Sequence, residues 1–172
     1  MGGKIDVYSE KGKGSAFVVT VPLKTAKEDR RRTERTTYQE YDFSGKRALL
    51  VEDNEINIEI TRNILIHKNF MVDIAENGKA GVEQFLKHEP GYYDVILMDI
   101  RMPVMSGLEA ARQIRAMSRT DAQTVPIIAM TANAYEEDVS QSLAAGMNAH
   151  LAKPIEPQVI LDTLAGYIGS KN

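Results

Sequence analysis

The chain has 172 residues, 43% of them hydrophobic and 26% charged, as is typical of a globular protein large enough to bury a core. A formal net charge of −3 gives no attraction to nucleic acid or to an anionic membrane surface, so we expect neither as a direct partner. The lack of cysteine excludes disulfides, thiolate metal sites and thiol nucleophiles. Because no segment could span a bilayer and no signal peptide opens the chain, we expect it to be cytoplasmic.

The first part of the chain predicts a β-hairpin. The segments "KIDVYSE" and "SAFVVTVPL" alternate imperfectly between apolar and polar residues, and "KGKG" between them supplies hairpin glycines. Because two strands alone are only marginally stable in water, we interpret residues 1–24 as the end of a larger domain. Residues 25–45 mix both charge signs and show no apolar period, which indicates a solvated linker.

From residue 46 to residue 172, short apolar runs alternate with helical patterns. The predicted strands are 48–51, 71–75, 95–98, 127–130 and 149–152. Between them, Ile56, Ile60 and Ile64 share one helix face. The same spacing relates Val82, Phe85 and Leu86, and again Leu161, Leu164 and Ile168. Continuous apolar strands separated by helices predict an α/β domain whose parallel sheet is covered on both faces.

Two sequence features predict where helices of this domain begin and end. Ser106 followed by Glu109 in "SGLE" is a capping box at the start of a helix. Gly146 after "SLAA" suits a left-handed cap at the end of another. Both positions fall between predicted strands, as the α/β interpretation requires.

Charged and hydroxyl residues follow several of the predicted strands. Glu52 and Asp53 come after the first strand of the domain, Asp99 after the third, Thr131 after the fourth and Lys153 after the fifth. Taken alone, the first two could be a solvated strand end that caps the next helix. In parallel α/β sheets, however, ligands bind beyond the carboxyl ends of the strands, and we expect all five side chains to meet there.

The chemistry of this group points to phosphoryl transfer. Three packed carboxylates repel one another, and a hard divalent cation that prefers oxygen ligands, Mg²⁺ above all, would relieve the repulsion. With the ion bound, Lys153 and Thr131 still face the same place and require an anionic partner such as a phosphoryl group. Asp99, in the central position, can then act as the nucleophile and form an aspartyl phosphate.

Four motifs carry a family resemblance. "LLVEDNEIN", "ILMDIRMPVMSG", "PIIAMTAN" and "HLAKP", in this order and spacing, resemble the receiver domain of two-component signalling, and closely the receivers fused to hybrid sensor histidine kinases. Each motif alone is weak, but their combination is specific. The resemblance covers roughly residues 46–168 and implies a flavodoxin-like, doubly wound, five-stranded parallel sheet with strand order 2-1-3-4-5.

The resemblance also implies roles for the metal-binding residues. Asp99 would be the phosphoacceptor and would bind Mg²⁺ together with Asp53. Glu52 would act on the ion through water, and the backbone carbonyl of Arg101 would complete the protein ligands.

For the phosphoryl group, the resemblance implies that Lys153 pairs with its oxygens, that Thr131 hydrogen-bonds them and that the N–H of Ala132 assists. It also implies a cis peptide bond between Lys153 and the following proline. Thr131 would turn toward the phosphoryl group and act as a switch. His150 occupies the place of the family's aromatic switch residue, and two interpretations stay open: it swings toward Thr131, or it is a partly packed strand histidine without a signalling role.

The N-terminal segment resembles the last hairpin of a histidine-kinase ATP-binding domain, with Gly12, Gly14 and Ser15 matching its final glycine-rich box. Nothing in the chain matches the phosphorylated histidine or the asparagine-rich ATP box, so we expect no kinase activity from it. The implied parent is a hybrid kinase whose upstream segments could anchor it in a membrane.

We therefore expect a receiver that takes a phosphoryl group from a phosphohistidine, on its own kinase dimerisation domain or on a histidine phosphotransfer protein. It would catalyse its own phosphorylation and a slow dephosphorylation. A phosphatase with an aspartate nucleophile is the alternative enzyme, but Arg101 stands where such an enzyme needs its second acid. A receiver fold used only as an interaction surface would not need the complete set of acids, threonine and lysine.

Overall fold

The computed structural model describes residues 3–22, 40–132 and 136–170. The chain divides into two compact units, residues 1–38 and 39–172, and each is described by itself. In the described parts of both units, every helix is too short or too polar to cross a membrane.

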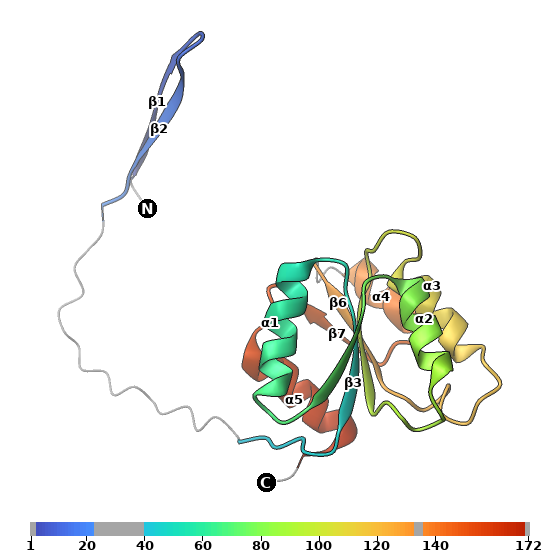
Figure 1. Cartoon of the computed structure of the whole chain (residues 1–172). Helices are drawn as coiled ribbons and strands as arrows, with labels where there is room; N and C mark the ends of the chain where they lie inside the picture. The colour runs from blue at the N-terminus through green and yellow to red at the C-terminus, as the bar shows by residue number, and fades with distance from the viewer. Residues whose placement is uncertain (1–2, 23–39, 133–135, 171–172) are drawn as a thin grey trace. The chain divides into compact units, whose positions relative to one another are not determined.

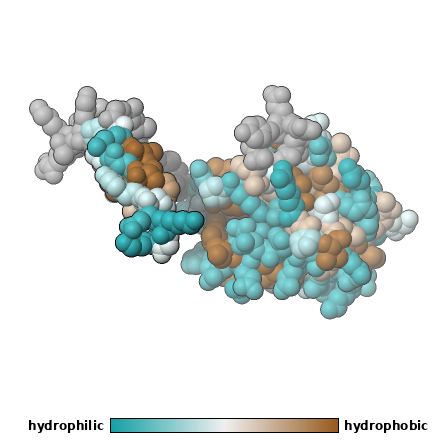
Figure 2. Space-filling model, turned by 90° about the horizontal axis from the view of Figure 1, so that it is seen from above, coloured by the Kyte–Doolittle hydropathy of each residue, from teal (hydrophilic) through white to brown (hydrophobic). Residues whose placement is uncertain are grey.

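The first unit contains the predicted hairpin. Strands β1 (Lys4–Glu10) and β2 (Gly14–Thr20) pair antiparallel (Figure 1). Gly12 and Gly14 have φ angles of 86° and 101°, which side chains rarely tolerate, so the turn depends on glycine. One face of the pair is apolar and exposed, as the hydrophobic atoms on the hairpin in Figure 2 show; it consists of Ile5, Val7, Phe17 and Val19.

The second unit is built on a five-stranded parallel sheet. Its strands are β3 (Arg47–Val51), β4 (Met71–Ala75), β5 (Val95–Asp99), β6 (Ile127–Thr131) and β7 (Ala149–Ala152). They lie in the order β4-β3-β5-β6-β7. Counted from the start of this unit, that is the predicted order 2-1-3-4-5, and the predicted fold class is confirmed.

In the described part of this unit, helices cover both faces of the sheet (Figure 1). Helices α1 (Glu55–Ile66) and α5 (Pro157–Ile168) lie on one face. Helices α2 (Gly78–Lys87), α3 (Gly107–Arg115) and α4 (Glu136–Ala144) lie on the other. Successive strand residues supply the two cores alternately: Leu49 faces the α2 side and Leu50 the α1 side, and both are fully buried. Burial on both faces explains the apolar runs of the central strands β3, β5 and β6.

The helix ends are fixed by side chains close in sequence. Asn54 caps α1 by accepting hydrogen bonds from the N–H groups of Ile56 and Asn57. Ser106 caps α3 by accepting from the N–H of Glu109, as the sequence predicts. Gly146, with φ of 89°, follows α4 in the predicted left-handed conformation.

Two features of the packing differ from the simple sequence pattern. Of the three isoleucines that share one face of α1, Ile56 and Ile60 are exposed and Ile64 is partly buried, whereas Thr61 and Leu65 are buried. The predicted linker 25–45, whose first part lies outside the described residues, includes two buried aromatic side chains, Tyr41 and Phe43. Phe43 stacks on Phe70 with 4.5 Å between ring centroids, so the packed part of the second unit begins before residue 46.

Candidate functional site

The strand register brings the predicted site residues to one edge of the sheet. Val51 at the end of β3 pairs with Met98 of β5, so Glu52 and Asp99 emerge side by side. Thr131 at the end of β6 pairs with Ala152 of β7, and the N–H of Lys153 donates to the carbonyl of Thr131 at 2.7 Å. Four strands thus bring the predicted site residues to the same place because their carboxyl ends are aligned.

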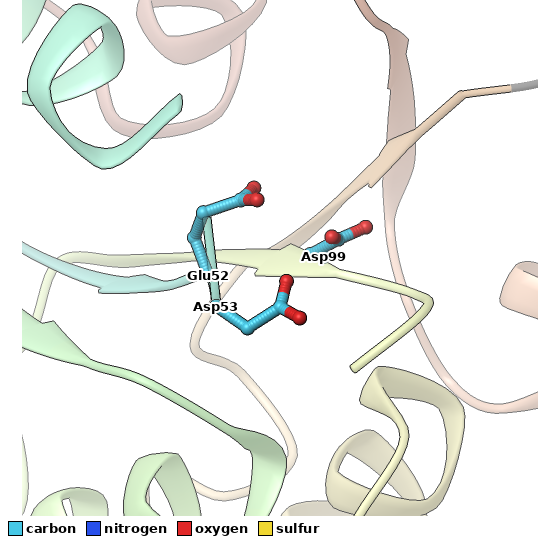
Figure 3. Close-up of side chains that lie close together, drawn as sticks. All are labelled: Glu52, Asp53 and Asp99. Carbon is cyan, nitrogen blue, oxygen red and sulfur yellow. The ribbon is translucent and has the colours of Figure 1, made fainter. Parts of the chain in front are cut away.

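Three carboxylates converge at this edge. One oxygen from each of Glu52, Asp53 and Asp99 lies within 4.8 Å of the other two, and Figure 3 shows the carboxylates gathered at the ends of β3 and β5. Glu52 is 1% exposed and Asp99 7% exposed, whereas Asp53 is open to solvent. The cluster therefore combines two buried acids with one, Asp53, that solvent reaches.

Lys153 connects two of the acids. Its Nζ lies 2.6 Å from Oε2 of Glu52 and 2.8 Å from Oδ2 of Asp99, and its side chain is 16% exposed. Ion pairs this close and this buried are screened little by solvent. Three ionised carboxylates facing one ammonium group leave two negative charges, which is the charge that a divalent cation neutralises.

The donor set fits a hard cation. Asp53 and Asp99 offer carboxylate oxygens, the ligands that Mg²⁺ prefers. Both oxygens of Glu52 accept hydrogen bonds, from Lys153 and from Nδ2 of Asn57 at 3.0 Å, and Glu52 is the most buried of the three acids. The N–H of Arg101 donates to Oδ1 of Asp99 at 3.3 Å, which holds the loop after β5 against the site.

The other predicted residues lie at the same edge of the sheet or on the strands that lead to it. Thr131 is buried at the end of β6, and Ala132 follows it at the surface. The side chain of Arg101 is exposed. His150 is exposed on β7, where it pairs with Ala129, two positions before the pair formed by Thr131 and Ala152. The Lys153–Pro154 peptide bond is cis, as the resemblance implies.

Two residues of the site were missed in the sequence. Asn57 donates a hydrogen bond to Glu52. The sequence indicated this role only by a second asparagine in a helix turn that Asn54 already caps. Gly107 opens α3 against the backbone of Asp99: a Cβ added at Gly107 would lie 2.0 Å from the carbonyl oxygen of Asp99. The glycine in "SGLE" could have indicated this close approach.

Known proteins are similar to this chain. Residues 48–165 match the family model of the response regulator receiver domain. The aerobic respiration control sensor protein ArcB of Escherichia coli is 38% identical over 158 residues, which are 90% of this chain and 19% of that protein. The chain thus spans about a fifth of the length of this curated relative.

Two solved structures are also similar. The receiver domain of sensor histidine kinase PA1611 from Pseudomonas aeruginosa is 39% identical with a TM-score of 0.66, covering 74% of this chain and 100% of that one; its crystal structure has a magnesium ion coordinated in the active site cleft. The receiver domain of Ssk1 from Saccharomyces cerevisiae, crystallised with the histidine phosphotransfer protein Ypd1, is 30% identical with a TM-score of 0.63 and covers 72% of this chain and 88% of that chain.

The fold, the cluster of carboxylates at the edge of the sheet and these similarities agree. The chain belongs to the response regulator receiver family.

Proposed function

We propose that Asp99 is the phosphoacceptor of a phosphorelay and that the reaction depends on Mg²⁺. The observation that carries this proposal is the contact of Lys153 with both Glu52 and Asp99, in a cluster of carboxylates whose third member, Asp53, is exposed to solvent. We assign the direct protein ligands of the ion to Asp53, Asp99 and the carbonyl of Arg101, with Glu52 acting through water.

Each residue of the site would have its own role in phosphoryl transfer. An oxygen of Asp99 forms a bond to phosphorus while the bond between phosphorus and the donor's histidine nitrogen breaks, and the histidine leaves with the electron pair of that bond. Lys153 stabilises negative charge on the transferring oxygens, assisted by the hydroxyl of Thr131 and the N–H of Ala132. A bound Mg²⁺ would supply further charge neutralisation.

The donor in this proposal is a protein-bound phosphohistidine, either on the parent's own dimerisation domain or on a phosphotransfer protein. The complex of Ypd1 with the Ssk1 receiver, a relative at 30% identity, supports the second source. Because Arg101 replaces the general acid that an aspartate phosphatase needs, we propose a relay with slow loss of phosphate instead of rapid turnover of small phosphate esters.

The N-terminal unit has a proposed origin as well. We assign residues 1–24 to the end of a histidine-kinase ATP-binding domain, residues 25–45 to a linker whose last residues join the fold of the second unit, and the rest to the receiver. The similarity to ArcB supports this because it extends over 90% of the chain. The exposed apolar face of the hairpin, which includes Val7 and Phe17, is what a strand pair removed from a larger sheet would leave.

The domain would pass on its signal through a change in the conformation of its surface. Thr131 would turn toward the phosphoryl group, and His150, exposed on β7, has room to change position with it. Phosphorylation would in this way alter the surface beside β7.

The direct test uses the full chain with acetyl phosphate and Mg²⁺. The expected result is a mass gain of one phosphoryl group that is lost in Asp99→Asn and on chelation of Mg²⁺. Beryllium fluoride with Mg²⁺ should change the amide spectrum of the parent protein but not that of the variant. A mass gain that persists in Asp99→Asn, or repeated turnover of a generic phosphomonoester, would overturn the proposal.

A further inference from the structure

Glu52 is held by two donors from opposite sides. Its carboxylate is 1% exposed, its Oε2 accepts from Nζ of Lys153 at 2.6 Å, and its Oε1 accepts from Nδ2 of Asn57 at 3.0 Å. The two donors come from different elements, Lys153 from the segment after β7 and Asn57 from the first turn of α1. The orientation of Glu52 therefore depends on both.

The amide of Asn57 is not needed to cap its own helix. Asn54 already accepts from the N–H groups of Ile56 and Asn57, at 3.0 and 3.1 Å. Asparagine is also a poorer helix former than leucine or alanine. Helix formation alone therefore does not account for asparagine at position 57, whereas the hydrogen bond to Glu52 does.

The consequence reaches the phosphoacceptor. Asn57, Glu52, Lys153 and Asp99 form one continuous chain of side-chain contacts from α1 to the end of β5. Without Asn57, Lys153 would be the remaining side-chain donor to the Glu52 carboxylate among the described residues, and the carboxylate would be held from one side. The same motion would shift the ammonium group that Glu52 shares with Asp99.

We propose that Asn57 is a positioning residue for the metal ion. It holds Glu52 in one orientation, from which the carboxylate can accept a hydrogen bond from water on an ion ligated by Asp53 and Asp99. This inference rests on the proposed function, because it requires that the site bind Mg²⁺. Loss of a hydrogen-bond partner outside the ligands themselves typically weakens metal binding about 10- to 100-fold.

The test compares Asn57→Leu with Asn63→Leu, the same substitution at an exposed position in the last part of α1. Leucine has a similar size, favours helix and donates no hydrogen bond. Binding of Mg²⁺ to the full chain is measured by calorimetry and by amide shifts, and unfolding is followed with and without the ion. Phosphorylation by acetyl phosphate is then measured over a range of Mg²⁺ concentrations.

For Asn57→Leu we expect the Kd for Mg²⁺ to rise about 10-fold or more and the stabilisation by Mg²⁺ to shrink, with much of the phosphorylation rate recovered at saturating ion. Asn63→Leu should bind Mg²⁺ like the parent. Unchanged Mg²⁺ affinity in Asn57→Leu, or an equal loss in both variants, would overturn the inference while leaving Asp99 as phosphoacceptor. If the parent protein itself bound no Mg²⁺, the proposed metal site would fail, and the role of Asn57 with it.

Discussion

The ammonium group of Lys153 lies 2.8 Å from the carboxylate of Asp99, so a fixed positive charge stands beside the proposed nucleophile. The same group is 2.6 Å from Glu52 and nearly buried. An ammonium held in advance at this distance needs little reorganisation when charge develops on a transferring phosphoryl group.

Removing this charge should slow the reaction. In Lys153→Met, which keeps the long side chain without its charge, we expect phosphorylation by acetyl phosphate at saturating Mg²⁺ to fall about 100-fold. Initial rates measured by mass spectrometry check this. Lys79→Met, on the exposed surface of α2, is the matched control and should react like the parent. A rate for Lys153→Met within about twofold of the parent would contradict the role given to Lys153.

The carboxylate cluster predicts opposite effects of Asp53→Asn with and without Mg²⁺. In EDTA the substitution removes one of three mutually repelling charges, so the free energy of unfolding should rise. With Mg²⁺ at about 100 times its Kd, the parent should gain about 2.7 kcal/mol, and the variant should gain much less.

Denaturant unfolding of both proteins in the two buffers measures this difference. Glu83→Gln, at an exposed position of α2, corrects for the change in net charge. Equal stabilisation of the parent and of Asp53→Asn by Mg²⁺ would show that Asp53 does not bind the ion.

The sequence predicted the strands and the site because both depend on a simple pattern. Each buried strand is an apolar run, and the acids at positions 52, 53 and 99 stand where such runs end. In a parallel sheet, the positions that follow the strands meet at one edge whatever the details of packing. The convergence of Glu52, Asp53 and Asp99 could therefore be expected from the sequence alone.

What the sequence did not reveal depends on packing between distant elements. Periodicity favoured the face of Ile56 and Ile60, but α1 turns Thr61 and Leu65 inward, and a buried threonine does not register in an apolar pattern. Phe43 stands in a polar segment, and only its stacking on Phe70 makes it part of the core. The hydrogen bond from Asn57 to Glu52 likewise depends on side-chain orientation, which spacing does not determine.

Substitution by alanine should have opposite effects on stability at two helix glycines, Gly107 and Gly166. In Gly107→Ala the new Cβ would lie 2.0 Å from the carbonyl oxygen of Asp99, and backbone cannot move aside cheaply. We expect a loss of about 3 kcal/mol in the free energy of unfolding, together with slower phosphorylation because Asp99 shifts.

Gly166→Ala is the control, since a Cβ on this exposed residue of α5 has open space around it. It should stabilise the protein by about 0.5–1 kcal/mol through helix propensity. Urea unfolding of the two variants measures both effects. An unchanged free energy of unfolding in Gly107→Ala would mean that the start of α3 is not in close contact with the backbone of Asp99.

A last prediction concerns acid stability and a partly buried ion pair away from the site. Arg119 pairs with Asp121 through two contacts of 2.6 and 3.0 Å, and Asp121 also accepts from the N–H of Gly91 at 2.8 Å. Burial alone would raise the pKa of Asp121, but the hydrogen bonds from Arg119 and Gly91 and the charge of Arg119 together lower it below its usual 3.8.

The sign of the pH effect follows from this lowered pKa. Below pH 3.8 the unfolded chain takes up a proton at Asp121 before the folded protein does, so acid favours unfolding. The stability that Asp121 contributes is complete above that pH and disappears as the pH falls through the pKa that Asp121 has in the folded state.

Asp121→Asn should lower the free energy of unfolding by about 2 kcal/mol at neutral pH, because Arg119 loses its charged partner. The difference in the free energy of unfolding between Asp121→Asn and the parent should become smaller below pH 3.8. Urea unfolding at a series of pH values measures this difference, with Glu83→Gln as the control. A difference that stayed constant across this acid range would show that Asp121 titrates alike in the folded and unfolded chains.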